Sequence, residues 1–186
     1  MVQLAAGEEL VLDGPLSRLR MGLGWDSDAG AGIARTGRPQ VDLDATALEF
    51  TGAQLFDLAF YNNLTTRDGS VTHLGDNDSG SGEGDDEQIL VDLSKVHGPV
   101  DTILFLVSSY QGHSLEWVAG AYCRLVDDET DEELARFTLT FTLKDTGAVM
   151  ALLRRTDSGW ALKAVGEGVP ITVPTQGLAK LTRFVS

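Results

Sequence analysis

The sequence is short of several kinds of residue, and each shortage excludes a class of protein. Its 186 residues include one cysteine, Cys123, so no internal disulfide can form, whereas a secreted β-rich domain of this size would often carry several. Basic residues number 14 against 28 acidic ones, and the formal net charge of −14 repels nucleic acid and anionic lipid. We therefore expect a chain of the reducing cytoplasm that has no nucleic-acid partner and binds cations or basic proteins.

Long apolar stretches are also absent. The longest one, Val100–Tyr110, is interrupted by Asp101 and is well below the roughly 20 residues of a membrane-spanning helix. The first residues lack the basic region and the apolar stretch of a signal peptide, so we expect neither a signal peptide nor a membrane span. Apolar residues still make up 42% of the chain, which is enough for a sizeable core. We predict a single domain over residues 1–186 and leave the placement of the tail, 166–186, open.

Signatures of catalysis are missing as well. The chain has no Gly-x-Ser-x-Gly nucleophile elbow, no Gly-x-x-x-x-Gly-Lys-Ser/Thr phosphate loop and no Gly-x-Gly-x-x-Gly fingerprint. His73, His97 and His113 lie far apart in the sequence, so a zinc site has little support. Cys123 is predicted to be a buried hydrophobic residue rather than a nucleophile. We expect that the protein is not an enzyme.

What the sequence does contain is a succession of short strand-like runs. They are rich in Val, Ile, Thr and Phe and are separated by turn residues, with 21 glycines in the chain. The predicted strands are Leu16–Trp25, Val41–Phe50, Phe56–Tyr61, Ser70–His73, Glu87–Asp92, Thr102–Val107, Ala121–Asp127, Leu134–Leu143, Val149–Arg155 and Trp160–Val165. This pattern predicts an all-β fold, a two-sheet antiparallel β-sandwich with long loops and little helix. Asp157-Ser158-Gly159 predicts a hairpin turn, and Leu178–Phe184 a short strand or helix.

The segment Gly75–Glu87 concentrates acidic residues, with six carboxylates, four glycines and no basic residue. Glycine lets a backbone turn tightly enough to bring several oxygens to one centre, and Ca²⁺ takes about six to eight oxygen ligands. Asp76, Asp78 and Glu87 match positions 1, 3 and 12 of an EF-hand loop, but Ser81 stands where that loop needs glycine, so we reject the EF-hand. A cation would relieve the repulsion among these carboxylates, and a solvated acidic turn is the alternative interpretation.

Oxygen-bearing side chains also gather at the ends of other predicted strands. Asp42 and Asp44 are two residues apart, so the period of a strand places both carboxylates on one face. Asp26 and the pair Asn62 and Asn63 follow two further strands. Loops at one end of a sandwich converge, which favours a common oxygen-rich site, while a solvated strand edge is the alternative.

Five short motifs follow one another along the chain: MGLGWD at 21–26, VDLDA at 41–45, FYNNL at 60–64, DGSVTH at 68–73 and GDDE at 84–87. Together they resemble the TerD family of tellurium-resistance and general stress proteins, and the resemblance extends from about residue 1 to residue 168. It implies a calcium-binding β-sandwich of the bacterial cytoplasm that holds two Ca²⁺ ions and has no catalytic reaction.

Carried onto this sequence, the resemblance assigns metal ligands to both clusters. The implied ligands are Asp26, Asp42, Asp44, Asn62, Asn63, Asp76, Asn77, Glu83, Asp85, Asp86 and Glu87. The loop departs from the family's usual pattern, because Ser81 stands where a glutamate is usual and Glu83 where an aspartate is usual. His73, just before the acidic segment, is a candidate to orient a metal ligand.

The resulting hypothesis is a calcium-binding, non-enzymatic protein of the TerD type. It would act in stress response or tellurium resistance as a calcium-dependent interaction module, with protein partners in a stress-response assembly. A metal-dependent hydrolase that holds Mg²⁺ or Mn²⁺ is one alternative, but no Lys or Arg stands near the acidic segment to support it. The other alternative is a Ca²⁺-dependent carbohydrate-binding sandwich, which would need exposed aromatic side chains beside the ion. A second acidic run, Asp127–Glu133, is expected to form a solvated hairpin loop.

Overall fold

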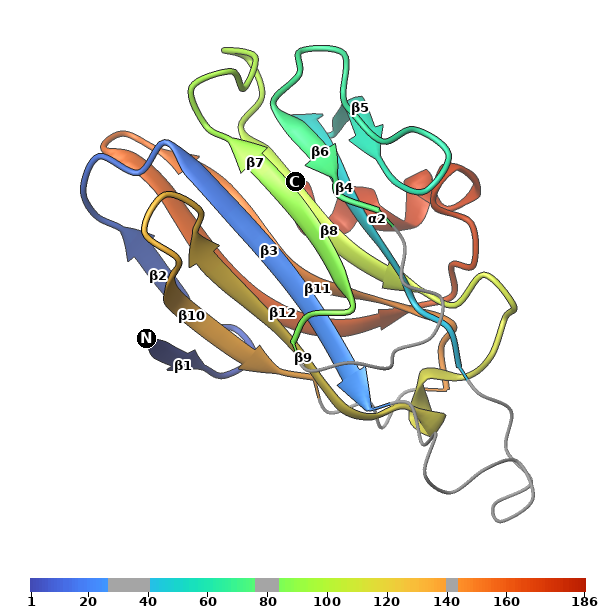
Figure 1. The fold of residues 1–186 in the computed structure, drawn as a ribbon. Coiled ribbons are helices and arrows are strands. Elements are labelled where there is room, and N and C mark those ends of the chain that lie inside the picture. The colour runs from blue at the N-terminus through green and yellow to red at the C-terminus, as the bar shows by residue number, and fades with distance from the viewer. Residues whose placement is uncertain (27–40, 76–83, 140–143) are drawn as a thin grey trace.

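The strands form two sheets that pack face to face (Figure 1). The computed structural model describes residues 1–26, 41–75, 84–139 and 144–186. The first sheet has the order β1 (Val2–Leu4), β10 (Glu132–Thr138), β9 (Ala119–Asp127), β3 (Arg18–Asp26), β7 (Glu87–Asp92) and β6 (Val71–His73). The second has the order β2 (Glu9–Leu12), β12 (Gly159–Val169), β11 (Gly147–Thr156), β8 (Thr102–Ser108), β4 (Asp44–Thr51) and β5 (Gln54–Ala59). The predicted all-β, two-sheet sandwich is confirmed.

Each predicted strand has a counterpart, and the differences lie at the edges. β1 and β2 were not predicted, because each is very short and buries a single side chain, Leu4 or Leu12, so neither shows a readable alternation. β1 also pairs with β10 in parallel, whereas the other neighbours are antiparallel within the described chain. The strand predicted to reach Leu143 ends at Thr138, and residues 140–143 lie outside the described part. The hairpin at Asp157–Gly159 is confirmed by the pairing of Thr156 with Gly159.

The C-terminal tail forms a helix that covers the outer face of the second sheet (Figure 1). Helix α2 spans Leu178–Val185, after the 3₁₀ turn η2 (Pro174–Gln176), and a second 3₁₀ turn, η1, spans Leu115–Trp117. The apolar side chains of α2 recur at helical spacing, and Leu181, Phe184 and Val185 are buried against the sheet. The segment predicted as a short strand or helix, Leu178–Phe184, is therefore a helix, and its packing on the sheet decides this.

Two hydrophobic layers result, one between the sheets and one beneath α2. All seven residues of β8 are buried because Ile103, Phe105 and Val107 face the first layer while Leu104 and Leu106 face the second. Burial on both faces of β8 accounts for the longest apolar run of the sequence, so no membrane is needed to explain it. No helix in the described ranges is long and apolar enough to span a bilayer.

Cys123 of β9 lies in the layer between the sheets. Burial raises the pKa of its thiol to about 12, so the thiol is protonated at neutral pH. The prediction of a buried hydrophobic cysteine is confirmed.

The carboxyl group of Glu49 on β4 is buried in the fold. Its Oε1 lies 2.7 Å from the Ser70 hydroxyl, which also lies 2.8 Å from Oδ1 of Asp68, while Oε2 has no hydrogen-bond partner among the described residues. Burial raises the pKa of Glu49 to about 7 against the hydrogen bond from Ser70, and the carboxylate of Asp68 raises it further. Because the Ser70 hydroxyl has one hydrogen for two acceptors, a protonated Glu49 supplies the second hydrogen.

We predict that this carboxyl group makes stability depend on pH. The folded protein holds a proton at Glu49 up to about pH 7, whereas the unfolded chain releases it near the model value of 4.5. The stabilisation is therefore complete below about pH 4.5 and is lost as the pH rises to about 7. Thermal melts in chelator between pH 5 and 8 should show a steeper fall of Tm for the wild type than for Glu49→Gln. The exposed Glu132→Gln is the matched control and should follow the wild type; parallel curves for Glu49→Gln and the wild type would contradict the prediction.

Candidate metal centre

Three strands of the sandwich begin or end at the same end of the molecule. β3 ends there at Asp26, β4 begins there at Asp44 and β7 begins there at Glu87 (Figure 1). β3 and β7 are antiparallel neighbours in the first sheet, while β4 belongs to the second. The described end of the acidic segment, residues 84–87, and the strand-end aspartate Asp44 therefore lie at one end of the fold.

Asp86 ties the end of the acidic segment to the end of β3. Its backbone N–H donates to the carbonyl of Leu23 at 2.8 Å, at the end of the pairing between β3 and β7. Its carboxylate Oδ2 accepts the backbone N–H of Trp25 at 3.0 Å. Asp86 is buried, and the amide that it binds belongs to Trp25, the residue immediately before Asp26.

Glu87 ties the same segment to the second sheet. Its Oε2 lies 2.9 Å from Nε2 of His73 and accepts the backbone N–H of Ala45 at 3.2 Å. Nδ1 of His73 accepts the N–H of Gly75, which assigns the ring hydrogen of a neutral His73 to Nε2, facing the carboxylate. Both side chains are about 1% exposed. The structure thus places His73 where a residue that orients a candidate ligand has to be.

The strand-end aspartates lie beside this bridge. Asp44 is buried and directly precedes Ala45, whose amide Glu87 holds. Leu43 packs into the core between the sheets, so the alternation predicted for Asp42, Leu43 and Asp44 places the two carboxylates away from that core. Burial and the nearby carboxylate of Asp44 raise the pKa of Tyr61, which places this phenol beside the strand end.

The other predicted ligands are placed differently. Asn62 and Asn63 lie in an exposed turn after β5, where the Asn63 amide donates to the carbonyl of Leu58 at 2.7 Å. Asp26 ends β3, and its side chain is outside the described part. Asp76, Asn77 and Glu83 also lie outside the described residues. Within the described ranges alone, no three His, Cys, Asp or Glu side chains form a group that could hold a metal ion.

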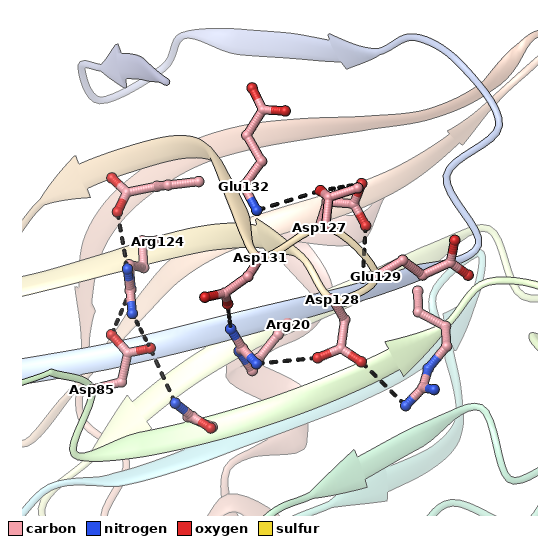
Figure 2. A network of polar contacts seen from close by, with 12 residues as sticks. Arg20, Asp85, Arg124, Asp127, Asp128, Glu129, Asp131 and Glu132 are labelled. Carbon is pink, nitrogen blue, oxygen red and sulfur yellow. Dashed lines mark hydrogen bonds and ion pairs between the residues drawn. The ribbon is translucent and has the colours of Figure 1, made fainter.

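Asp85 faces away from Asp86 and Glu87, toward the outer face of the first sheet. Its two carboxylate oxygens accept from Nε and Nη2 of Arg124 at 2.7 and 3.0 Å (Figure 2). The expectation that no basic residue stands near the acidic segment is therefore wrong. Arg124 is distant in the sequence but lies on β9, where it pairs in register with Gly22 of β3, so only strand pairing brings it here.

Comparisons with known proteins identify the family of this chain. The family model of the TerD domain matches residues 1–183. The chain belongs to the TerD domain family. Tellurium resistance protein TerZ of Serratia marcescens is 40% identical over 156 residues, covering 81% of this chain and 80% of TerZ. Stress response protein SCP2 of Bacillus subtilis is 36% identical over 166 residues, covering 82% of this chain and 83% of SCP2.

Solved structures support the fold of this TerD domain. A crystal structure of a homologue of telluride resistance protein (TerD) from Streptomyces coelicolor A3(2) matches with a TM-score of 0.72 over 90% of this chain and 98% of that chain. The sequence identity is 18%, so the likeness concerns the fold alone. Relatives of this TerD domain are thus named as resistance and stress proteins, and the fold is shared with a named homologue.

The second acidic run of this TerD domain is a hairpin loop between β9 and β10, as predicted, but it is not simply solvated. Asp128 pairs with Arg18 and Arg20 of β3 at 3.2 Å each, and Asp131 also pairs with Arg20 (Figure 2). The loop therefore closes over β3, and two of its carboxylates are neutralised by arginines that the sequence places far away.

The glycines of the GLGW motif now have a structural reason. A Cβ atom at Gly22 would lie 2.1 Å from Oδ2 of Asp85, and one at Gly24 would lie 2.5 Å from the ring of Tyr122. Both positions must stay bare because the side chains of neighbouring segments lie across β3 at these points.

We predict that Gly22→Ala displaces Asp85 from Arg124 and lowers the free energy of unfolding by about 1–3 kcal/mol, the usual cost of overpacking. Gly98→Ala is the matched control, because nothing lies within 4 Å of its added Cβ. Denaturant titration should separate the two variants. Equal stability of Gly22→Ala and Gly98→Ala would show that the Asp85 side chain moves aside at no cost.

Proposed function

We propose that this TerD domain is a calcium-binding, non-enzymatic cytoplasmic protein that holds two ions at the acidic end of its sandwich. It acts in stress response or tellurium resistance as a calcium-dependent interaction module with protein partners. The observation that carries the proposal is the pair of carboxylates that join three strand ends, Asp86 to Trp25 and Glu87 to Ala45. Each of the two amides is adjacent to a further aspartate, Asp26 or Asp44.

The chemistry of the donors supports a hard cation. Carboxylate oxygens at the ends of β3, β4 and β7 are the ligands that Ca²⁺ prefers, and several of them on a Gly-rich segment suit its flexible coordination better than the strict octahedron of Mg²⁺. The residues that would hold the ions are Asp26, Asp42, Asp44, Asp86 and Glu87, with Asp76, Asn77 and Glu83 of the acidic segment. Asp85 is left out because Arg124 occupies both of its oxygens.

The hydrolase alternative gains little from the presence of Arg124. Its guanidinium binds Asp85 and also Glu133, at 3.1 Å, so two carboxylates already compensate its charge. The carbohydrate alternative has one supporting observation. Tyr110 is 61% exposed and packs edge-on against Tyr61, next to Asp44, so an aromatic pair borders the proposed centre. Titration of the calcium-loaded protein with oligosaccharides decides it, because binding that vanishes in chelator would favour a lectin-like role.

Calorimetric titration tests the main proposal. We expect two Ca²⁺ ions per chain and clearly weaker binding of Mg²⁺. At 100 times the dissociation constant, calcium should stabilise the fold by about 2.7 kcal/mol for each site and raise Tm by several degrees over the protein in chelator. Superimposable melts, or binding of Mg²⁺ as tight as that of Ca²⁺, would reject the calcium proposal.

A double-mutant cycle tests whether the strand end and the acidic segment form one centre. Asp44→Asn and Asp86→Asn should each weaken Ca²⁺ binding, and the double variant should lose less than the sum, because the second change acts on a damaged site. Asp157→Asn, in the exposed β11–β12 hairpin, is the control and should bind as the wild type does. Affinity must be measured apart from Tm, because removal of one repelling charge can stabilise the metal-free protein. Unchanged affinity in Asp44→Asn would leave only the acidic segment as the site.

A further inference from the structure

Asp85, Asp86 and Glu87 are consecutive acids whose side chains do different things. Strand alternation directs Glu87 into the fold together with Ile89 and Val91. Asp85 lies before β7 begins and does not follow this alternation, and its carboxylate is held by Arg124 over the outer face of the first sheet. Glu87 and Asp86 hold the backbone of other strands at the proposed centre. Asp85 is therefore the residue that anchors the end of the acidic segment from the opposite side of the sheet.

The anchor of Asp85 is a built site with little room for a metal. Its carboxylate is 0% exposed and accepts from Nε and Nη2 of Arg124. It also lies 3.2 Å from the hydroxyl of Tyr122 and 3.3 Å from the amide nitrogen of Gln88. Three N–H donors point to the carboxylate of Asp85, and the Tyr122 hydroxyl shares its one hydrogen between this carboxylate and the carbonyl of Gly84. Bidentate pairing of this kind also fixes the orientation of both groups.

Arg124 is itself held in place from behind. Its Nη1 contacts Glu133 at 3.1 Å, and Glu133 makes two 2.8 Å hydrogen bonds with Arg136. The guanidinium of Arg136 lies 4.2 Å from the ring centroid of Tyr122, whose hydroxyl lies 3.0 Å from the carbonyl of Gly84. The hydrogen bonds from Arg124 and Tyr122 thus reach two consecutive residues of the acidic segment from β9.

The geometry points to Arg124 as a positioning residue for the metal centre: by holding Asp85 it sets the place from which Asp86 and Glu87 reach Trp25 and Ala45. Its effect on calcium rests on the proposed function, whereas the hold on the backbone does not. An arginine near a cation site would by its charge alone weaken cation binding. A positioning arginine strengthens it, so the two roles predict changes of opposite sign when the residue is replaced.

We predict that Arg124→Gln binds Ca²⁺ on the order of tenfold more weakly, the usual cost of losing a group that orients a ligand. Arg124→Lys keeps the charge but not the bidentate geometry, so it should also bind more weakly. Arg20→Gln is the matched control, because Arg20 lies on the same face and pairs with Asp128 and Asp131 instead. Stronger or unchanged Ca²⁺ binding by both Arg124 variants would overturn the inference.

A measurement without calcium separates this inference from the proposed function. The backbone amide of Trp25 is held by Asp86, so its hydrogen exchange in metal-free protein reports the position of the segment. Exchange should be faster in Arg124→Gln, and to a smaller extent in Tyr122→Phe, but unchanged in Arg20→Gln. If the wild type fails to bind Ca²⁺, the proposed function is rejected. Hydrogen exchange at Trp25 still tests whether Arg124 positions the segment. Unchanged exchange in Arg124→Gln, with the fold intact, would overturn it.

Asp85→Asn distinguishes an anchor from a metal ligand. If Asp85 is an anchor, Asp85→Asn should weaken Ca²⁺ binding about as much as Arg124→Gln does, and the double variant should bind no more weakly than either single variant. If Asp85 is a metal ligand, Asp85→Asn should weaken Ca²⁺ binding more than Arg124→Gln does and should reduce the number of bound ions. That outcome would contradict the inference.

Discussion

The carboxylate of Glu87 joins the two sheets at the acidic end of the sandwich. It belongs to β7 of the first sheet, and it accepts the backbone N–H of Ala45 on β4 of the second. A buried carboxylate is costly unless donors compensate it, and here the backbone amide and His73 do so. This bond fixes β4 against β7 at the end of the sandwich where Asp44 and Asp86 lie.

On the outer face of the first sheet, arginines hold acidic side chains in place. Arg20 and Arg124 lie on β3 and β9 and pair with acids from loops that close over the sheet, Asp128 and Asp85. The protein has twice as many acidic as basic residues, and these two arginines act where acidic segments must be fastened to the sandwich. The acidic end therefore has ordered carboxylates on the inside and an arginine-held carboxylate on the outside.

Much of the fold could be predicted from local pattern. The two-residue alternation and the turn residues identified strands such as Glu87–Asp92 with their observed bounds, and the sandwich followed from their number. The weakly patterned edges could not be predicted. β1 and β2 bury one side chain each, and they exist because β10 and β12 offer them a partner.

The sequence by itself determined that oxygen donors gather in the acidic segment and around Asp42 and Asp44, since composition and period are local properties. It also identified His73 as a residue to watch. Only the tertiary structure decided which carboxylate faces which partner: Arg124 reaches Asp85 because β9 pairs with β3, and Glu87 reaches Ala45 because the sheets stack. These contacts join residues far apart in the chain, and strand pairing between distant segments leaves no mark in the spacing of either one.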